Sequence, residues 1–243
     1  MPARILARLL FALLTLFIAL PRIAEAQTKR KTFVPGQRAI VVEERLSALR
    51  AQADVKAPLE QRLRRGRVVG ILGARRGKDG QQFLRVAVSR NARGWLLAEA
   101  VVRSGNAADA KRLLKLIEET NDDFVKARLA RLCADEFRTT KHAPRCLLLL
   151  GEAAEHAAER LTRDAKRRVG DEEPGEGQSP NVTKRDYFLN FAGLDRYNRG
   201  GVTFDYDQTA DRIVYDGGAF RELLRRYPKS AEAQAMKEKL NKK

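Results

Sequence analysis

The feature that most constrains this sequence is a run of short apolar segments separated by turns, over Arg67–Val102. Segments rich in Val, Ile and Leu are typical of strands, and Gly-containing junctions are typical of tight turns. The pattern predicts a strand over Arg67–Ala74, a turn over Gly77–Gly80 and a returning strand over Gln82–Val88. Apolar and polar side chains alternate along the returning strand, which predicts one buried face and one wet face.

The flanking residues extend this β-rich region in both directions. A second turn at Asn91–Gly94 leads into a third short strand that contains Trp95, the one Trp of the chain. The apolar segment Ala39–Val42 predicts a strand before the run. Residues Glu43–Arg65 fit two alternatives, a short helix or a long loop with apolar anchors, and Pro58 favours a break.

The order of these pieces resembles that of a bacterial SH3 domain. The resemblance rests on an early Leu-Arg pair, a Gly-led strand after a basic turn, an aromatic-led strand, and Gly-Trp-Leu with an apolar close. In this chain these features are Leu49-Arg50, Arg65-Gly66, Phe83–Val88, Gly94-Trp95-Leu96 and Val101-Val102. The resemblance covers residues 33–103 and implies a small SH3-like β-barrel that recognises cell-wall peptide or a protein partner.

From Asn106 onward the apolar residues recur every three to four positions, which predicts helices. Asn106 is placed to cap a first helix, and Asn121 or Asp122 to cap a second. Pro144 is typical of the first turn of a third. Residues 106–169 are therefore expected to form antiparallel helices joined by short turns.

A polar, acidic segment rich in Gly and Pro follows at residues 170–182, and we expect a flexible loop there. Beyond it, residues 183–240 again show helical patterns, most clearly at Asp216–Leu240. There a helix, a Tyr-Pro turn and an Ala-rich helix resemble one tetratricopeptide unit. Stable arrays usually stack at least three such units, so isolated hairpins remain the alternative. The expected fold class is multi-domain α and β, an SH3-like β-barrel followed by an α-helical, tetratricopeptide-like domain.

The first 26 residues match the pattern of a secretory signal peptide. Arg4 and Arg8 form a basic flank before the apolar run Leu9–Leu20. Small residues at Ala24–Ala26 offer a cleavage site, and a basic leader follows at 27–32. The apolar run is shorter than the roughly 20 residues that a membrane-spanning helix needs. We expect an exported protein, periplasmic or secreted, without an integral membrane span after cleavage; an uncleaved signal anchor is the alternative.

The chain is strongly basic, with a formal net charge of +17 at pH 7 from 48 Lys and Arg against 31 Asp and Glu. Such a charge attracts acidic partners over long distances. For an exported chain these partners are acidic cell-wall polymers, acidic glycans and anionic lipid headgroups, and nucleic acid is not expected. The alternative is that the charge serves solubility alone.

The sequence contains no convincing catalytic, cofactor or metal motif. The segment Gly73–Asp79 has one residue too few for a phosphate-binding loop, and Asp follows its Lys where Ser or Thr is needed. The Asp residues Asp205, Asp207 and Asp211 lack the Gly and Glu that complete a calcium loop. We therefore predict no cofactor and no metal.

The Cys and His residues do not indicate a catalytic pair. Neither Cys133 nor Cys146 lies in the Gly-Asp-Cys context of cell-wall cysteine peptidases. In an oxidising compartment the two can form a disulfide, and two buried thiols are the alternative. The two His residues, His142 and His156, are expected in a loop and on a helix surface.

A candidate binding surface remains on the predicted barrel. Its aromatic rings can stack on a peptide or sugar, while its basic side chains attract carboxylates. The candidate residues are Arg75, Arg76, Lys78, Phe83, Arg93 and Trp95. A core position is the alternative for Trp95. In the helical part, the aromatic residues fit either a peptide groove or internal packing; they are Tyr187, Tyr197, Tyr215, Phe220 and Tyr227.

The sequence therefore predicts an exported, non-catalytic binding or scaffold module that recognises cell-wall peptide or an envelope protein. One alternative is a cell-wall hydrolase that uses carboxylates between the two domains. The other is a non-specific binder of polyanions, whose affinity would fall steeply with salt.

Overall fold

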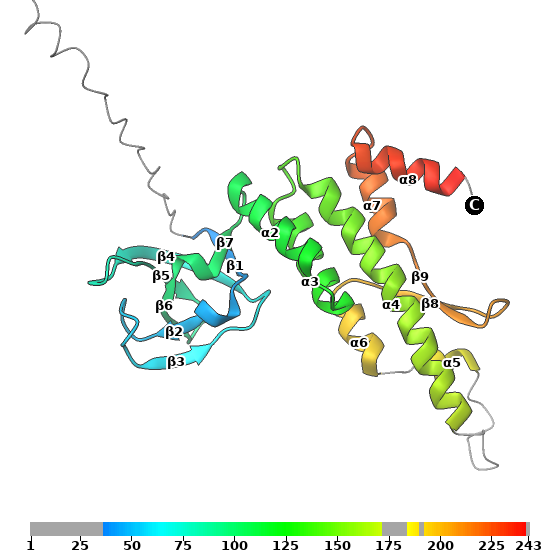
Figure 1. The fold of residues 1–243 in the computed structure, drawn as a ribbon, viewed down its shortest axis with the longest axis horizontal. Helices are drawn as coiled ribbons and strands as arrows, with labels where there is room; N and C mark the ends of the chain where they lie inside the picture. Colours follow the sequence, from blue (N-terminus) through cyan, green and yellow to red (C-terminus); the bar gives the residue numbers. More distant parts are fainter. Residues whose placement is uncertain (1–35, 172–183, 190–191, 242–243) are drawn as a thin grey trace, which may run out of the picture. The chain divides into compact units, whose positions relative to one another are not determined.

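The computed structural model describes residues 36–171, 184–189 and 192–241 (Figure 1). The signal peptide expected at residues 1–26 and the leader at 27–32 lie outside this part of the chain. So does most of the loop expected at residues 170–182, of which the first two residues end a helix instead. Among the described residues, no helix is both long and apolar enough to cross a membrane.

Residues 36–103 form a seven-stranded sheet in which all paired strands are antiparallel. The spatial order is β3 (Leu59–Arg62), β2 (Ala48–Arg50), β6 (Arg93–Leu97), β5 (Gln82–Ala87), β4 (Val68–Arg76), β1 (Arg38–Val41) and β7 (Val101–Arg103). Because β3 and β7 are the two edges, the pairing of the described strands does not close. The expected barrel is thus present as an open antiparallel sheet.

The core of the sheet lies on one face of its central strands. Leu84 and Val86 of β5 are buried there, as their alternation predicts, together with Ile71 of β4 and Leu96 of β6. Burying a side chain of this size stabilises a fold by about 1.5–3 kcal/mol. Gly94 lets β2 pass close to β6, because a Cβ there would lie 2.7 Å from the side chain of Leu49.

Residues 43–65 form neither the helix nor the single loop considered from the sequence. They contain the short helix η1 (Glu44–Leu46), strands β2 and β3, and the loop between these strands. The leucines that would line such a helix or anchor such a loop have different environments, since Leu49 and Leu63 are buried while Leu59 is 49% exposed. The strands escape sequence analysis because each is very short and β2 pairs with β6, which is distant in sequence.

Three helices follow the sheet, α2 (Ala107–Glu119), α3 (Asp123–Glu136) and α4 (Ala143–Asp171). The two predicted caps are present: the Asn106 side chain accepts a hydrogen bond from the N–H of Asp109 at 3.0 Å, and Asp122 accepts one from the N–H of Val125 at 2.8 Å. Such caps satisfy N–H groups that have no partner within the helix. Pro144 lies in the first turn of α4, where its missing N–H costs no helical hydrogen bond.

The last described segments are α5 (Lys184–Leu189), α6 (Ala192–Asn198), β8 (Phe204–Asp207), β9 (Arg212–Tyr215), α7 (Gly218–Arg226) and α8 (Ala231–Asn241). Strands β8 and β9 form an antiparallel hairpin. Helix α4 contacts α2, α3, β9, α7 and α8, so it is the central element of the helical part (Figure 1). The β-hairpin separates α6 from the helix–turn–helix formed by α7 and α8.

Covalent and packing contacts join the described elements of this structure. A disulfide links Cys133 of α3 to Cys146 of α4, and both residues are fully buried, so the disulfide alternative is the one present. Gly151 of α4 admits the ring of Phe220, which a Cβ would meet at 2.1 Å. The sheet adds Ile40, Val42 and Val102 to the core of the helices. Sheet and helices therefore belong to one compact unit.

A buried ion pair also connects the sheet to the helices. Arg103 at the end of β7 donates to the carboxylate of Asp109 in the first turn of α2, with Nε and Oδ2 2.6 Å apart. The same carboxylate oxygen accepts a hydrogen bond from the Arg103 backbone N–H at 3.1 Å. Because the Asn106 side chain caps this turn, the junction between β7 and α2 has a defined geometry.

Candidate binding surface

The predicted binding residues lie on three neighbouring strands and the turn between two of them. Arg75 and Arg76 end β4, Lys78 lies in the following turn, Phe83 is on β5, and Arg93 and Trp95 are on β6. The four basic residues are exposed and Trp95 is half-buried. Trp95 is therefore accessible to a ligand, in contrast to its neighbours Gly94 and Leu96, which are buried.

Phe83 requires a correction, because its side chain is only 1% exposed and cannot stack on a ligand. Gly77 lies directly over its ring: a Cβ on Gly77 would be 2.9 Å from Phe83 Cε2 and 3.0 Å from the carbonyl oxygen of Ala53. Phe83 is therefore packed against the turn after β4, and this turn also lies close to Ala53 of the β2–β3 loop. The sequence pattern placed it on the wet face without showing that a loop covers this face.

Strand register decides which basic residues accompany Trp95. Trp95 pairs with Arg85 on β5 and with Arg50 on β2, and directly paired residues point to the same face with Cβ atoms about 4.5–5.5 Å apart. Arg93, two residues before Trp95, shares this face because side chains alternate along a strand. Arg75 also shares it, since it pairs with the outward-facing Phe83.

We define the outer face as a group of five accessible residues on the side of the sheet opposite its core, namely Arg50, Arg75, Arg85, Arg93 and Trp95. Two predicted residues do not belong to it: Arg76 pairs with Gln82 on the opposite face, and Lys78 lies in the turn. Arg50 and Arg85 were missed from the sequence. Alternation with Leu84 and Val86 would have placed Arg85 outward, but its position beside Trp95 depends on strand pairing.

The basic side chains of the sheet region are largely free of carboxylate partners. Residues 36–103 contain fifteen Lys and Arg against six Asp and Glu. Within the described residues, the members of this set that form ion pairs are Arg38 with Glu136, at 2.8 Å, and Arg103 with Asp109. Both partners are helical residues. The positive charge of the outer face is therefore not neutralised by the described part of the molecule.

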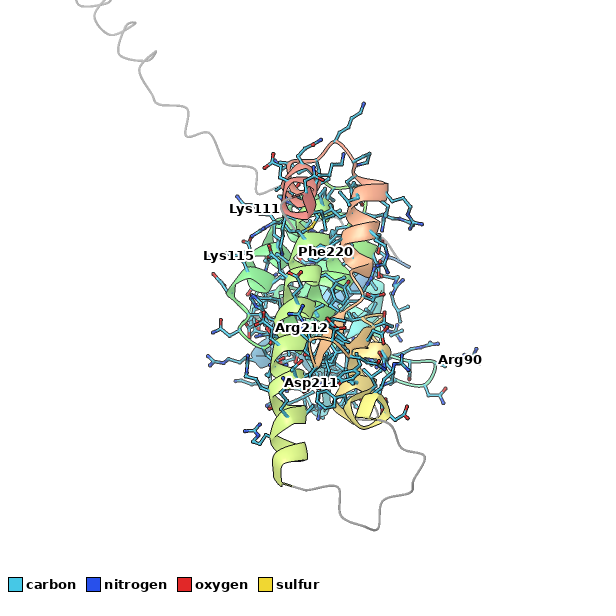
Figure 2. All side chains as sticks on the ribbon, turned by 90° about the vertical axis from the view of Figure 1, so that its right-hand side faces the viewer. Arg90, Lys111, Lys115, Asp211, Arg212 and Phe220 are labelled. Atoms are coloured by element: carbon cyan, nitrogen blue, oxygen red, sulfur yellow. A yellow bond between two sulfur atoms is a disulfide. The ribbon has the colours of Figure 1, made fainter. Side chains whose placement is uncertain are left out.

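The turn between β5 and β6 continues this pattern. Figure 2 shows Arg90 of this turn reaching away from the body of the molecule, and Arg90 is exposed. Arg50 is more constrained, because its Nη1 donates to the carbonyl oxygen of Ala57 at 2.7 Å. One member of the outer face is thus held in place by the loop, while Arg85 and Arg93 are free to adapt to a ligand.

The carboxylates and histidines considered from the sequence have separate surroundings in the described part of the chain. No group of three or more His, Cys, Asp and Glu that could hold a metal occurs among the described residues. Asp205 pairs with Arg185 at 2.9 Å, Asp207 accepts backbone hydrogen bonds in the β8–β9 turn, and Asp211 pairs with Lys166 at 3.7 Å. His142 precedes α4, and His156 is exposed on α4.

The pKa values of two carboxylates, Asp135 and Glu222, are shifted in opposite directions. Burial raises the pKa of Asp135, which Arg131 at 3.9 Å only partly offsets. Burial would raise the pKa of Glu222 as well, but hydrogen bonds from Arg131 and Arg226 outweigh it and hold this pKa below its ordinary value. Both oxygens of Glu222 accept bonds from guanidinium groups, so this carboxylate joins α7 to α3 and is not positioned as a base.

Comparison with models of known protein families, with curated proteins and with solved structures gave no match. The function proposed below therefore rests on the residues and geometry of this chain.

Proposed function

We propose that the protein is an exported, non-catalytic binding module of the cell envelope that recognises carboxylate groups of cell-wall peptide through its outer face. The observation that carries this proposal is the position of half-buried Trp95 between Arg50 and Arg85 in a region whose cations have few carboxylate partners. The resemblance of residues 33–103 to bacterial SH3 domains supports the same ligand class.

The chemistry of the outer face suits a peptide that carries carboxylates. A guanidinium can donate two parallel hydrogen bonds to one carboxylate, which gives orientation as well as affinity. The indole of Trp95 supplies an apolar surface on which the rest of a peptide or a sugar can stack. Neither group alone distinguishes a wall peptide from another anion, whereas an aromatic ring between two guanidinium groups favours ligands with both properties.

In this proposal the helical part is the scaffold that supports the sheet. The shared core and the Arg103–Asp109 pair support this role. The resemblance of Asp216–Leu240 to a tetratricopeptide unit also supports it, as does the helix–turn–helix of α7 and α8. The signal-like residues 1–26 support an envelope location.

The test is a pulldown of the mature chain, from Gln27 onward, with purified peptidoglycan at low and high salt. Two variants change the outer face: the double substitution Arg85→Gln/Arg93→Gln and, separately, Trp95→Ala. The matched control is Arg45→Gln/Arg64→Gln, which removes two exposed cations of the same region that lie outside the outer face.

We expect retention at high salt by the wild type and the control, and loss in both outer-face variants. Binding that disappears with salt and falls equally in test and control variants would show a non-specific polyanion binder instead. Absence of binding at either salt would overturn the proposed ligand. Zymography on the same wall preparation tests the non-catalytic part of the proposal, which a cleared band would overturn in favour of a hydrolase.

A further inference from the structure

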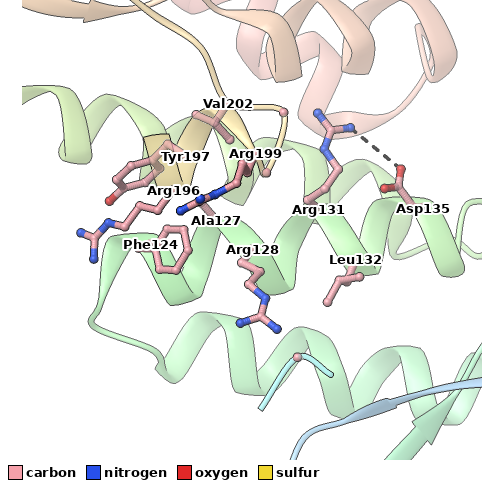
Figure 3. A pocket seen from close by; sticks show the side chains of 13 residues that line it. Phe124, Ala127, Arg128, Arg131, Leu132, Asp135, Arg196, Tyr197, Arg199 and Val202 are labelled. Carbon is pink, nitrogen blue, oxygen red and sulfur yellow. Dashed lines mark ion pairs between the residues drawn. The ribbon is translucent and has the colours of Figure 1, made fainter. Parts of the chain in front are cut away.

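A second basic site lies in the helical part, in a pocket of about 750 Å³ (Figure 3). It is formed by α3 and by the segment that runs from α6 towards β8, and Gly66 of the β3–β4 turn closes one side. We call it the arginine pocket, because Arg128 and Arg131 of α3 and Arg196 and Arg199 of the facing segment line it. None of the outer-face residues lines this pocket.

The floor of the arginine pocket is apolar and rigid. Tyr197 is 1% exposed and Val202 is 3% exposed. The Tyr197 ring meets the ring of Phe124 edge-on, with centroids 5.2 Å apart. The Tyr197 hydroxyl accepts a hydrogen bond from Arg160 at 2.9 Å, and Arg160 pairs in turn with Asp123 at 3.1 Å. These contacts hold α6 against α3, so the pocket is preformed.

The four arginines differ in how they are engaged. Arg131 is bound to Glu222 at 2.8 Å. The Arg196 guanidinium lies over the rings of Phe124 and Tyr197, at 4.7 and 5.2 Å from their centroids. The side chains of Arg128 and Arg199 form no hydrogen bond or ion pair with any residue that the structure describes, and both are exposed. Two guanidinium groups are therefore available for a ligand.

The position of Arg128 is set by the sheet. Its Cζ lies 3.1 Å from the place where a Cβ on Gly66 would be, and Gly66 has a φ of +77°. Glycine is suited to this turn on both counts, because it adopts a positive φ without strain and leaves room for the guanidinium. The Arg128 guanidinium thus lies beside this turn, on one side of the pocket.

The arginine pocket is lined by more basic than acidic side chains, which favours a bound anion. Four arginines line one cavity, whereas Asp135 is the one carboxylate among the described residues that lines it, and it already pairs with Arg131. Like charges held together repel, and a bound anion reverses the sign of this interaction.

We propose that the arginine pocket binds a carboxylate side chain or carboxyl terminus of an acidic peptide, with Arg128 and Arg199 as its direct ligands. The half-buried apolar side chains of Phe124 and Leu132, which line this pocket, fit the aliphatic part that joins such a carboxylate to its backbone. A free phosphate would use the guanidinium groups but leave these apolar side chains uncovered. Asp135 also disfavours a dianion more strongly than a single carboxylate. The proposal does not rest on the function of the outer face.

The test uses the full mature chain and isothermal titration calorimetry with three probes: an acetylated peptide with alternating Glu and Leu, its Gln counterpart, and inorganic phosphate. The variant Arg128→Gln/Arg199→Gln removes both free guanidinium groups, and Arg128→Lys/Arg199→Lys keeps their charge without the planar fork. The control Lys111→Gln/Arg163→Gln removes two exposed cations of α2 and α4 that do not line the pocket.

We expect the affinities of the Glu peptide for the wild type and for the control to agree within twofold. Its affinity for the Arg128→Gln/Arg199→Gln variant should be at least tenfold lower. The affinity for the Arg128→Lys/Arg199→Lys variant should lie between those for the wild type and for the Arg128→Gln/Arg199→Gln variant. The proposal is overturned if the wild type does not bind the Glu peptide, or if test and control variants lose affinity equally. Phosphate binding as tightly as the Glu peptide would overturn the ligand class. An outer-face variant that fails with peptidoglycan but still binds the Glu peptide separates the two proposals.

Discussion

The sheet and the helices of this molecule use their charges differently. In the helical part, ion pairs join separate elements: Arg131 of α3 with Glu222 of α7, and Lys239 of α8 with Glu155 of α4, both at 2.8 Å. In the sheet region, basic side chains such as Arg85 and Arg93 have no such partners among the described residues. The difference indicates that charge stabilises the arrangement of the helices, whereas the sheet is held by its apolar core and presents its charge outward.

The largest effect is expected where the two regions meet. Asp109→Ala removes the carboxylate that faces Arg103, whose side chain in this pair is 8% exposed. Removing one partner of a buried pair costs about 3–5 kcal/mol, because the other charge remains buried. Urea unfolding should show a loss of this size in the free energy of unfolding.

Glu119→Gln is the matched control for this change. Its carboxylate pairs with Lys115 at 3.7 Å, but the two side chains are 62% and 76% exposed. Exposed pairs of this kind contribute less than about 1 kcal/mol. Equal losses in the two variants would contradict the conclusion that the β7–α2 junction depends on a buried pair.

The second-largest loss of stability is expected from removal of the disulfide. Cys133→Ala/Cys146→Ala removes the link between α3 and α4, which closes a loop with a sequence separation of 13. A disulfide of this kind stabilises by about 2–4 kcal/mol, in most accounts by restricting the unfolded chain. The loss should appear as a lower thermal midpoint of unfolding. Wild-type protein whose disulfide has been reduced with dithiothreitol in the unfolded state should show the same decrease after refolding. An unchanged midpoint would show that the helical packing is sufficient alone.

A smaller, pH-dependent effect is expected at Glu222. Its pKa is held below the ordinary value in the folded state, so its contribution is present above the unfolded pKa and is lost as the pH falls through the folded pKa. Glu222→Gln should cost about 1.5–3 kcal/mol at pH 6, the range for hydrogen bonds to charged groups, and should flatten the decline below pH 4.5. The measurement is the free energy of unfolding from pH 6 to pH 3. Asp164→Asn, which affects the exposed pair with Arg167, should leave the decline unchanged.

The smallest effect on stability is expected on the sheet. Arg75→Gln/Arg76→Gln should change the free energy of unfolding by less than about 0.5 kcal/mol, as is usual for exposed positions without specific contacts. Arg131→Gln, which breaks a pair between α3 and α7, should cost more although it removes fewer charges. A loss in the sheet variant that equals the loss in Arg131→Gln would break the distinction between the two regions.

Local signals in the sequence predicted the elements that depend on neighbouring residues. Asn106 and Asp122 predicted helix starts because a cap acts within one turn of its own helix. The turn Gly77–Gly80 and its flanking strands were predicted for the same reason, as strand alternation and turn glycine are local. The Glu43–Arg65 segment was ambiguous because its strands are only three and four residues long, and because β2 pairs with the distant β6 as well as with β3.

The sites were harder to predict, since they depend on which distant residues meet. Trp95 and Arg93 were found from residue type, but Arg50 joins them through a strand pair that spans much of the sheet region. Phe83 was placed outward correctly and yet is covered by a loop. The arginine pocket is lined by Gly66, by residues of α3 and by residues of the segment from α6 towards β8, which are distant in sequence. Tyr197, one of the aromatics for which a peptide groove was an alternative, contributes to its floor but is packed within the core.

The length of α4 has a consequence for how this chain can vary. Its 29 residues span roughly 43 Å at 1.5 Å per residue, and α3, β9, α7 and α8 all rest on it. One inserted residue would rotate everything beyond it by about 100°. An insertion after Gly151 would thus turn the side that carries Ala158 and Thr162 away from β9, while seven residues would restore the face to within about 20°. The length of α4 therefore fixes which of its faces meets each neighbouring element. Insertion or deletion of a single residue should be tolerated far less than substitution of its exposed side chains.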